Sequence, residues 1–315
     1  MDDDSALVRR LACRYAEVCA DPVQRQRRDL WRRHNSRERT RPLIYLRAFA
    51  WHEIPESACQ CRDPFLRRWE DWLRNRLFWA ALGDDSVFEP WVPVPAAKIT
   101  PPEGLWGLPI RWVGRVQGGA GVCDPPIKTE ADLARLAGPH HRIDEAKTAE
   151  AVGRLQEVIG EALPVVADRT PAYTNFNGDI STLLAQLRGL EQVMWDMMDR
   201  PEWLHRLVGL MRDGILGVHQ EAETAGDWSL LSHYNQAMPY ALELADPAPG
   251  RTGVTRRELW CFCASQEFAL VGPAMFEEFM LRYQIPIMSQ FALSAYGCCE
   301  DLTGKIAVLR NSRRR

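Results

Sequence analysis

Hydrophobic residues recur at helical spacing in several long parts of the chain. Leu7, Leu11 and Tyr15 repeat every four residues within the segment from 5 to 34. The same kind of stripe is found in two further segments, 65–82 and 181–215. Such a stripe is typical of an amphipathic helix that covers a hydrophobic core. The sequence therefore predicts helices in all three segments.

Short apolar runs alternate with the helical segments. They are rich in β-branched and aromatic residues, and polar residues follow most of them. The runs are LIYLRAFAW (43–51), VFEPWVPVP (87–95), LPVVADR (163–169), WSLLSHYNQ (228–236), ELWCFCASQEF (258–268) and ALSAYGCCED (292–301). The segment PAMFEEFMLRYQIPIMSQF, before the last run, predicts a helix interrupted at Pro286. Strands that alternate with helices predict a mixed α/β protein with a parallel sheet.

Two parallel architectures fit this order of elements, a (β/α)8 barrel and a doubly wound sheet. A doubly wound sheet that binds nucleotides carries a glycine-rich loop between its first strand and helix. The best candidate, VQGGAGVCD (116–124), lacks the G-x-G-x-x-G spacing and has no helical pattern directly after it. We therefore expect a TIM-type (β/α)8 barrel with an N-terminal helical extension.

Composition and charge narrow the possible functions. The 315 residues carry a formal charge of −3, so no general surface for nucleic acid is expected. The basic run 25–34 is interpreted as a solvated helix face. No apolar stretch is long enough to cross a bilayer, and acids stand where a signal peptide needs a basic start. These patterns predict a cytoplasmic protein whose nine cysteines are free thiols or metal ligands.

In a TIM-type barrel the chemistry gathers where the strands end, on one face. Polar residues near the predicted strand ends are therefore the candidates for a site that binds a small molecule. They are Trp51, His52, Glu53, Arg169, His233, Asn235, Gln266, Glu267, Tyr296, Cys298, Cys299 and Glu300. Glu267 is suited to acid and base work, because burial raises the pKa of a carboxyl group toward neutrality.

Two adjacent cysteines, Cys298 and Cys299, stand in the run AYGCCEDL. Thiolates are favoured ligands of zinc, and the metal can activate a further thiol as a nucleophile. Neighbouring side chains point to opposite faces of a strand, so both cysteines could reach one ion only from a turn. Glu300 could add an oxygen ligand and His233 a nitrogen. The alternative is that the cysteines are small hydrophobic residues that fill the barrel.

Several segments together resemble the uroporphyrinogen decarboxylase superfamily. The segment VGPAMFEEFMLRYQIPIM before YGCCED is similar to the helix that precedes a ligand-bearing turn in that superfamily. Further similar segments are DLWRRHN, RPLIYLRAFAWHE, DDSVFEPWVPV, RGLEQVMWDMMDRPEWLHRL and LWCFCASQEF. The resemblance covers the chain from about Arg27 onward and suggests a divergent branch. It implies a helical extension in residues 1–40 and a TIM-type barrel in residues 41–315.

The superfamily divides into two kinds of chemistry. One branch decarboxylates uroporphyrinogen without a cofactor and carries an arginine-rich turn after its first strand. The other branch uses zinc to move methyl groups between a corrinoid protein and a thiol. This chain has AWHE at the first turn, and only Arg47 lies nearby, out of register. At the later turn, Tyr296 or Gly297 stands where the methyltransferases have histidine, depending on which cysteine is aligned.

The resemblance favours a zinc-thiolate methyltransferase that works with a corrinoid-carrying partner protein. In this interpretation Cys298, Cys299 and Glu300 hold the metal. The expected catalytic residues are His52, His233, Glu267 and Tyr296, and the expected substrate-binding residues are Trp51, Glu53, Arg169, Asn235 and Gln266.

Two alternatives to the methyltransferase stay open. One is a cofactor-independent decarboxylase. The other is an inactive, truncated barrel, because the superfamily's last cysteine and final strand would fall beyond Arg315. A barrel without its last strand exposes sheet edges, which predicts a possible homodimer.

Overall fold

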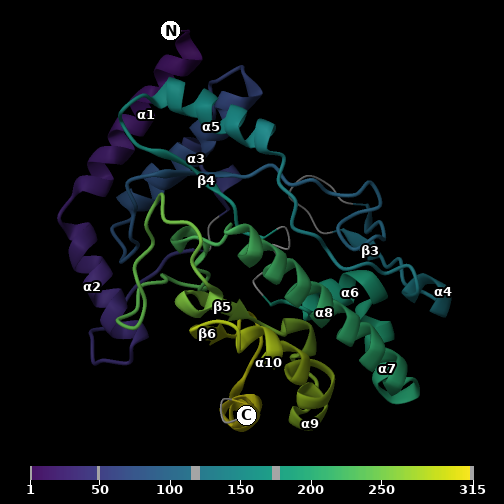
Figure 1. Cartoon of the computed structure of the whole chain (residues 1–315). Helices are drawn as coiled ribbons and strands as arrows, with labels where there is room; N and C mark the ends of the chain where they lie inside the picture. Colours follow the sequence, from purple (N-terminus) through teal and green to yellow (C-terminus); the bar gives the residue numbers. More distant parts are fainter. Residues whose placement is uncertain (1, 48–49, 115–120, 172–177, 313–315) are drawn as a thin grey trace. The chain divides into compact units, whose positions relative to one another are not determined.

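The computed structural model describes residues 2–47, 50–114, 121–171 and 178–312 (Figure 1). The chain divides into two compact units, and each unit is built from separate stretches of sequence. Unit 1 consists of residues 1–97, 143–169 and 237–251, and unit 2 consists of residues 98–142, 170–236 and 252–315. The first 40 residues, expected as an extension, belong to unit 1 together with the segment that follows them.

In its described residues, unit 1 combines four α-helices and one pair of strands. Its elements are α1 (Asp3–Ala20), α2 (Val23–Asn35), α3 (Pro64–Ala81), α5 (Glu145–Ile159), the 3-10 turns η1 (Trp51–Glu53) and η2 (Pro55–Ser57), and strands β1 (Val92–Pro95) and β4 (Val165–Asp168). The N-terminal helical stripe therefore forms two helices. The break falls at Pro22, whose ring removes a backbone donor and favours a helix start.

The core of unit 1 lies where α1, α3 and α5 meet the strand pair (Figure 1). Leu11 and Tyr15 of α1 are buried there with Trp69 of α3 and Leu155 of α5. β1 and β4 run parallel, with Val92 opposite Val165 at one end. The helical stripes predicted from the sequence thus face a common core.

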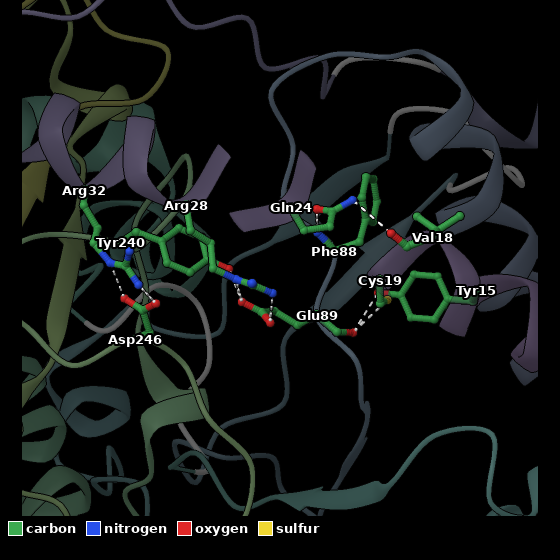
Figure 2. A network of polar contacts seen from close by, with 10 residues as sticks. All are labelled: Tyr15, Val18, Cys19, Gln24, Arg28, Arg32, Phe88, Glu89, Tyr240 and Asp246. Carbon is green, nitrogen blue, oxygen red and sulfur yellow. Dashed lines mark hydrogen bonds and ion pairs between the residues drawn. The ribbon is translucent and has the colours of Figure 1, made fainter. Parts of the chain in front are cut away.

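A polar network ties the segment 237–251 to α2 (Figure 2). The Glu89 carboxylate accepts two hydrogen bonds from Arg28, at 3.0 and 2.7 Å, and one from the Tyr240 hydroxyl. Arg32 forms a second ion pair with Asp246. Each partly buried carboxylate in this network is matched by a guanidinium group, so the network joins distant segments without leaving an unbalanced charge.

Unit 2 is mainly helical and contains the other two strand pairs. Its helices are α4 (Glu130–Leu133), α6 (Ser181–Arg188), α7 (Leu190–Asp199), α8 (Pro201–Ala225), α9 (Pro273–Phe276), the π-helical turn η6 (Glu277–Leu281), α10 (Arg282–Met288) and α11 (Ile306–Ser312). Its short 3-10 turns are η3 (Leu230–Ser232), η4 (Arg256–Glu258), η5 (Gln266–Phe268) and η7 (Thr303–Lys305). Its strands are β2 (Arg111–Val113), β3 (Val122–Asp124), β5 (Trp260–Cys263) and β6 (Leu293–Tyr296).

The pair β5 and β6 organises unit 2. The strands are parallel, with Trp260 opposite Leu293 and Cys263 opposite Tyr296. The crossover between them is the continuous helical run α9, η6 and α10, and α10 packs against both β5 and α8. This strand–helix–strand arrangement brings the carboxyl ends of both strands to the same edge. The two turns that follow are therefore neighbours.

The mixed α/β class is confirmed, whereas the expected barrel is not seen. The strands described form three two-stranded sheets, and within the described ranges no closed barrel is present. β2 and β3 form an antiparallel hairpin, and the other two pairs are parallel. No helix in the part of the chain that the structure describes is long and apolar enough to cross a membrane.

Two of the predicted strands take other forms. Residues 43–47 form no strand, because the backbone amides of Ile44 and Leu46 donate to the carboxylates of Asp85 and Asp84. Residues 48 and 49 of the same run lie outside the described residues. In the run 228–236, Ser229 caps the short turn η3. In both places side chains bind backbone amides that strand pairing would use, from distant residues in the first run and from a local cap in the second.

The predicted interruption at Pro286 is also wrong. α10 runs through Pro286 and ends at Met288. The preceding turn, η6, is π-helical. A π-turn changes the hydrogen-bond register just before the proline, which is one way for a helix to pass the position where the amide donor is missing.

Candidate functional site

The candidate site lies at the common edge where β5 and β6 end. Cys263 leads into Ala264 and Ser265, and Tyr296 leads into Gly297 and the two cysteines. Gly297 has a φ of +114°, a conformation that disfavours residues with a side chain. A Cβ atom there would come within 2.7 Å of the Leu302 side chain. Glycine therefore allows the tight turn that carries Cys298 and Cys299.

Glu300 joins the two turns. Its Oε1 accepts a hydrogen bond from the Ser265 amide at 2.8 Å, and its Oε2 accepts one from the Cys298 amide at 2.9 Å. Lys305 adds a second link, because its buried Nζ donates to the Phe268 carbonyl at 2.5 Å. Burial lowers the pKa of Lys305, and the negative charges of Glu300 and Asp301 oppose that shift. The turn after β6 is thus fixed against the turn after β5.

Uncharged side chains from β6, from the turn after β5 and from α10 form a hydrogen-bonded chain next to these turns. The Tyr296 hydroxyl is 2.6 Å from the Ser265 Oγ and donates to the Gln284 Oε1 at 2.7 Å. Gln284 in turn donates to the Ala264 carbonyl at 2.9 Å. Removal from water raises the pKa of Tyr296 well above its ordinary value, so the phenol keeps its proton. Tyr296 is therefore a neutral hydrogen-bonding group in this network.

The two thiols are close together and differ in exposure. The Sγ atoms of Cys298 and Cys299 are 3.5 Å apart, Cys299 is exposed and Cys298 is half-buried. Gln236 donates to the Cys298 Sγ at 3.3 Å. Two thiolates on one tetrahedral zinc lie about 3.8 Å apart, given Zn–S bonds of about 2.3 Å. The two sulfur atoms are therefore spaced as a pair of zinc ligands would be.

A full set of metal ligands is not assembled in the described ranges. No group of three or more His, Cys, Asp and Glu residues there is arranged to hold a metal ion. Both oxygens of Glu300 already accept backbone hydrogen bonds, so this carboxylate positions the turn. The thiol pair fits two positions around zinc, and the remaining positions would have to be filled by other groups.

Glu267 lies on the short turn η5, which follows β5. Its Oε2 accepts a hydrogen bond from the Ser181 hydroxyl at 2.6 Å, and its side chain is partly exposed. Asp179 lies next to this contact, with its Oδ1 accepting from the Thr182 amide at 3.1 Å. Burial raises the pKa of Asp179 to about 6, and the charge of Glu267 adds to the shift. Sequence reasoning missed Asp179, whose only local signal is its position just before a helix.

Residues predicted from unit 2 are only partly brought together. Tyr296 is the last residue of β6, and Gln266, Glu267, Cys298, Cys299 and Glu300 follow the ends of β5 and β6. His233 instead contacts the start of β5, where its Nδ1 accepts from the Trp260 amide at 3.4 Å. Asn235 is half-buried on the segment between His233 and Gln236. The structure thus gathers six of the predicted residues at one edge and places His233 against the other end of the same strand.

The remaining predicted residues belong to unit 1. Trp51 donates from its indole nitrogen to Asp71 at 2.9 Å. His52 and Glu53 are exposed, with 3.6 Å between the His52 Nε2 and a Glu53 carboxylate oxygen. Arg169 forms an ion pair with Glu145. Each of these side chains has a local partner within unit 1.

A second pair of thiols provides an internal contrast. Cys261 and Cys263 are fully buried on β5, with 3.8 Å between their Sγ atoms. The neighbouring Cys261 and burial together raise the pKa of Cys263 well above its ordinary value. Gly178 lies so close that a Cβ atom there would come within 2.7 Å of the Cys263 sulfur. This pair is packed in the interior.

Comparisons with protein-family models, curated proteins and solved structures gave no match to this chain. The class of this protein is therefore described from its fold and its candidate site alone. It is a mixed α/β protein that carries an exposed thiol, a half-buried thiol and several carboxylates at the carboxyl edge of a parallel strand pair. That edge is where parallel α/β proteins usually bind their ligands.

Proposed function

We propose that this protein is a thiol-dependent methyltransferase and that the turn after β6 carries its active site. The observation that supports the proposal best is the Cys298–Cys299 pair, with sulfurs 3.5 Å apart at the carboxyl edge of β5 and β6. The resemblance to the uroporphyrinogen decarboxylase superfamily supplies the reaction class. In one branch of that superfamily a methyl group passes between a corrinoid protein and a thiol.

The reaction forms one bond and breaks another. A methylated corrinoid, when supplied by the partner protein, would serve as the methyl donor: the carbon–sulfur bond to the thiolate would form as the carbon–corrinoid bond breaks, with its electron pair left on the corrinoid. The thiol must first lose its proton, because the thiolate is the nucleophile. Glu267 is the proposed base for that proton, since its carboxylate is partly exposed and is held in place by Ser181.

Zinc is part of this proposal, with Cys298 and Cys299 as its ligands. When bound, the metal would lower the pKa of a substrate thiol and make it a nucleophile at neutral pH. Gln236 and Glu300 would act on the ligands indirectly, since they contact Cys298 at its sulfur and at its amide. The corrinoid would arrive on a partner protein.

We also propose membership of this superfamily and, with it, a TIM-type barrel. The support is the sequence resemblance together with the strand–helix–strand unit of β5 and β6, which is the repeating unit of such barrels.

Decarboxylation is the less favoured reaction. Holding a substrate with several carboxylates needs cationic groups, and the described groups around the turn include Glu267, Glu300 and Asp301. Lys305 is directed at backbone carbonyls, and Arg169 is paired with Glu145. The charges of these residues therefore favour a neutral or cationic substrate over a polycarboxylate.

The proposal is tested by an anaerobic assay with methylcobalamin as methyl donor and a set of small thiols as acceptors. Formation of the thioether is expected with the wild-type protein and a loss of at least about 100-fold with the double variant Cys298→Ser/Cys299→Ser. Cys13→Ser is the matched control, because Cys13 is an exposed thiol in unit 1. Equal rates in the wild-type protein and the double variant would overturn the proposal.

A further inference from the structure

The two thiols after β6 are arranged for a second kind of chemistry. Cys299 is exposed, Cys298 is half-buried, and their sulfurs are 3.5 Å apart. An accessible thiol beside a second thiol is the arrangement found in redox-sensing cysteines, where one is oxidised and the other resolves it. The Cys261–Cys263 pair has a similar separation of 3.8 Å but is fully buried. Exposure, not proximity, distinguishes the two pairs.

We propose that Cys298 and Cys299 form a reversible vicinal disulfide when a peroxide reaches the turn, and that this bond switches the site off. The disulfide itself requires only the two thiols. The loss of activity rests on the proposed function, since the same two sulfurs would hold the zinc that activates the substrate thiol.

The oxidation proceeds in two balanced steps. The Cys299 sulfur attacks one peroxide oxygen, the O–O bond breaks, and a sulfenic acid and one water are formed. The Cys298 sulfur then attacks the Cys299 sulfur, the S–O bond breaks, and a second water leaves. The two thiols lose two electrons and two protons in total, and hydrogen peroxide is reduced to two waters.

The local geometry makes the disulfide possible and also weak. A disulfide bond is about 2.05 Å long, so the sulfurs must approach by about 1.5 Å. The α-carbons of neighbouring residues are about 3.8 Å apart across a trans peptide, which is shorter than the spacing that disulfides prefer. A strained disulfide is easily reduced, so the bond suits a reversible switch and not a structural crosslink.

Closing the bond would disturb the contacts that define the site. The Cys298 sulfur would move away from the Gln236 amide, which donates to it at 3.3 Å. The Cys298 backbone amide donates to Glu300, which also holds the turn after β5 through Ser265. Oxidation would therefore remove both thiols from chemistry and would also strain the link between the two turns.

The chain offers a built-in comparison for the test. Trypsin should release residues 258–282 and 283–305 as separate peptides, since each follows an arginine and ends in a basic residue. The first peptide holds Cys261 and Cys263, and the second holds Cys298 and Cys299. The folded, anaerobically purified protein is treated with hydrogen peroxide, its free thiols are alkylated, and both peptides are measured by mass spectrometry.

We expect the 283–305 peptide to lose two hydrogen atoms and to escape alkylation. The 258–282 peptide should keep both thiols, a thiol reductant should reverse the change, and Cys299→Ser should abolish it. The switch is overturned if the 283–305 peptide stays a dithiol, if Cys299 proceeds directly to the sulfinic acid, or if it crosslinks two chains. Methyl transfer, measured on the same samples, should fall at least about tenfold on oxidation and return on reduction.

The two proposals fail in different ways. A disulfide in a protein that never transfers methyl groups would leave the redox pair intact and overturn the proposed function. Methyl transfer by a protein whose thiols form no disulfide would overturn the redox switch and leave the proposed function standing.

Discussion

Two carboxylate-centred networks, one in each unit, show how similar polar groups can serve different purposes. In unit 1, Glu89 and Asp246 are paired with Arg28 and Arg32 (Figure 2). In unit 2, Glu300 is held by two backbone amides, and in the described residues it forms no ion pair. In the unit 1 network each carboxylate is paired with a guanidinium group, so the network joins segments of the chain and offers no unpaired charge to a substrate. Glu300 instead uses both oxygens to position the turn that carries the two thiols.

The largest effect is expected for Glu267→Gln. Loss of a positioned base reduces rates by about 100-fold or more, and Gln can still accept the hydrogen bond from Ser181. The rate of methyl transfer should therefore collapse while the free energy of unfolding changes little. Glu278→Gln is the control, because Glu278 is exposed and pairs with His205. An unchanged rate in Glu267→Gln would remove Glu267 from the mechanism.

Asp179 should produce an unusual dependence of stability on pH. Its pKa is raised from 3.8 to about 6, so the folded state binds this proton more tightly than the unfolded state. The resulting stabilisation is complete below about pH 4 and is lost as the pH rises through 6. It amounts to about 3 kcal/mol, at about 1.4 kcal/mol for each pKa unit.

The variant Asp179→Asn should remove this dependence. The difference in unfolding free energy between wild type and variant, measured in urea from pH 4 to 7.5, should decrease as the pH rises. Asp144→Asn is the matched control, because Asp144 also caps a helix but its pKa is lowered by the Lys147 amide. The difference in unfolding free energy between wild type and Asp144→Asn should rise slightly with pH in this range, because a carboxyl group with a lowered pKa loses its contribution mainly below about pH 4. If this free-energy difference changed with pH in the same direction for both variants, the buried environment assigned to Asp179 and the amide-bonded environment assigned to Asp144 would be contradicted.

Replacing Glu89 or Glu300 with glutamine shows how much each network contributes to the free energy of unfolding. Glu89→Gln leaves Arg28 partly buried without its partner, so a loss of about 2–3 kcal/mol of unfolding free energy is expected. Glu300→Gln keeps an acceptor for one of the two amides and should cost about 1 kcal/mol. Urea unfolding monitored by tryptophan fluorescence gives both values. A larger loss for Glu300→Gln than for Glu89→Gln would reverse the comparison.

An effect as small as that of Glu300→Gln is expected for Lys305→Met. The methionine side chain can fill the same space next to the Phe276 ring, which the Lys305 Nζ contacts at 4.9 Å from its centroid. The Phe268 and Ala269 carbonyls lose a donor, but the cost of burying a charge disappears. A net loss of about 1 kcal/mol is expected from urea unfolding. A loss as large as that for Glu89→Gln would mean that Lys305 supports unit 2 more than its hydrogen bonds indicate.

The sequence predicted those parts of the fold that depend on local periodicity. The stripes of α1, α3 and α8 face cores as expected, and the short runs at β4, β5 and β6 form strands. The run from 43 to 47 failed because distant carboxylates, Asp84 and Asp85, bind its amides. The hydrophobic pattern of a segment does not show which distant side chains will bind its backbone amides. The short strands also leave the expected barrel unsupported within the described residues.

The site was predicted where it follows from strand direction. Parallel strands end at one edge, so residues after β5 and β6 could be expected together without a structure. Asp179, Ser181 and Gln284 were missed because they come from segments that precede the turn, and only contacts in the fold connect them to it. Lys305 was missed although it follows Cys299 by six residues, because its hydrogen bond to Phe268 is not visible in the sequence. The separation of His233 from this edge depends on a hydrogen bond to Trp260 that the sequence does not reveal.

The central claim is that the thiol pair after β6 binds a ligand while the pair on β5 only packs. The most direct test is the zinc content of the anaerobically purified protein beside two variants, Cys298→Ser/Cys299→Ser and Cys261→Ser/Cys263→Ser. About one zinc per chain is expected in the wild-type protein and in the β5 variant, with none in the turn variant. Zinc that is retained without Cys298 and Cys299, or absent from the wild-type protein, would contradict the account.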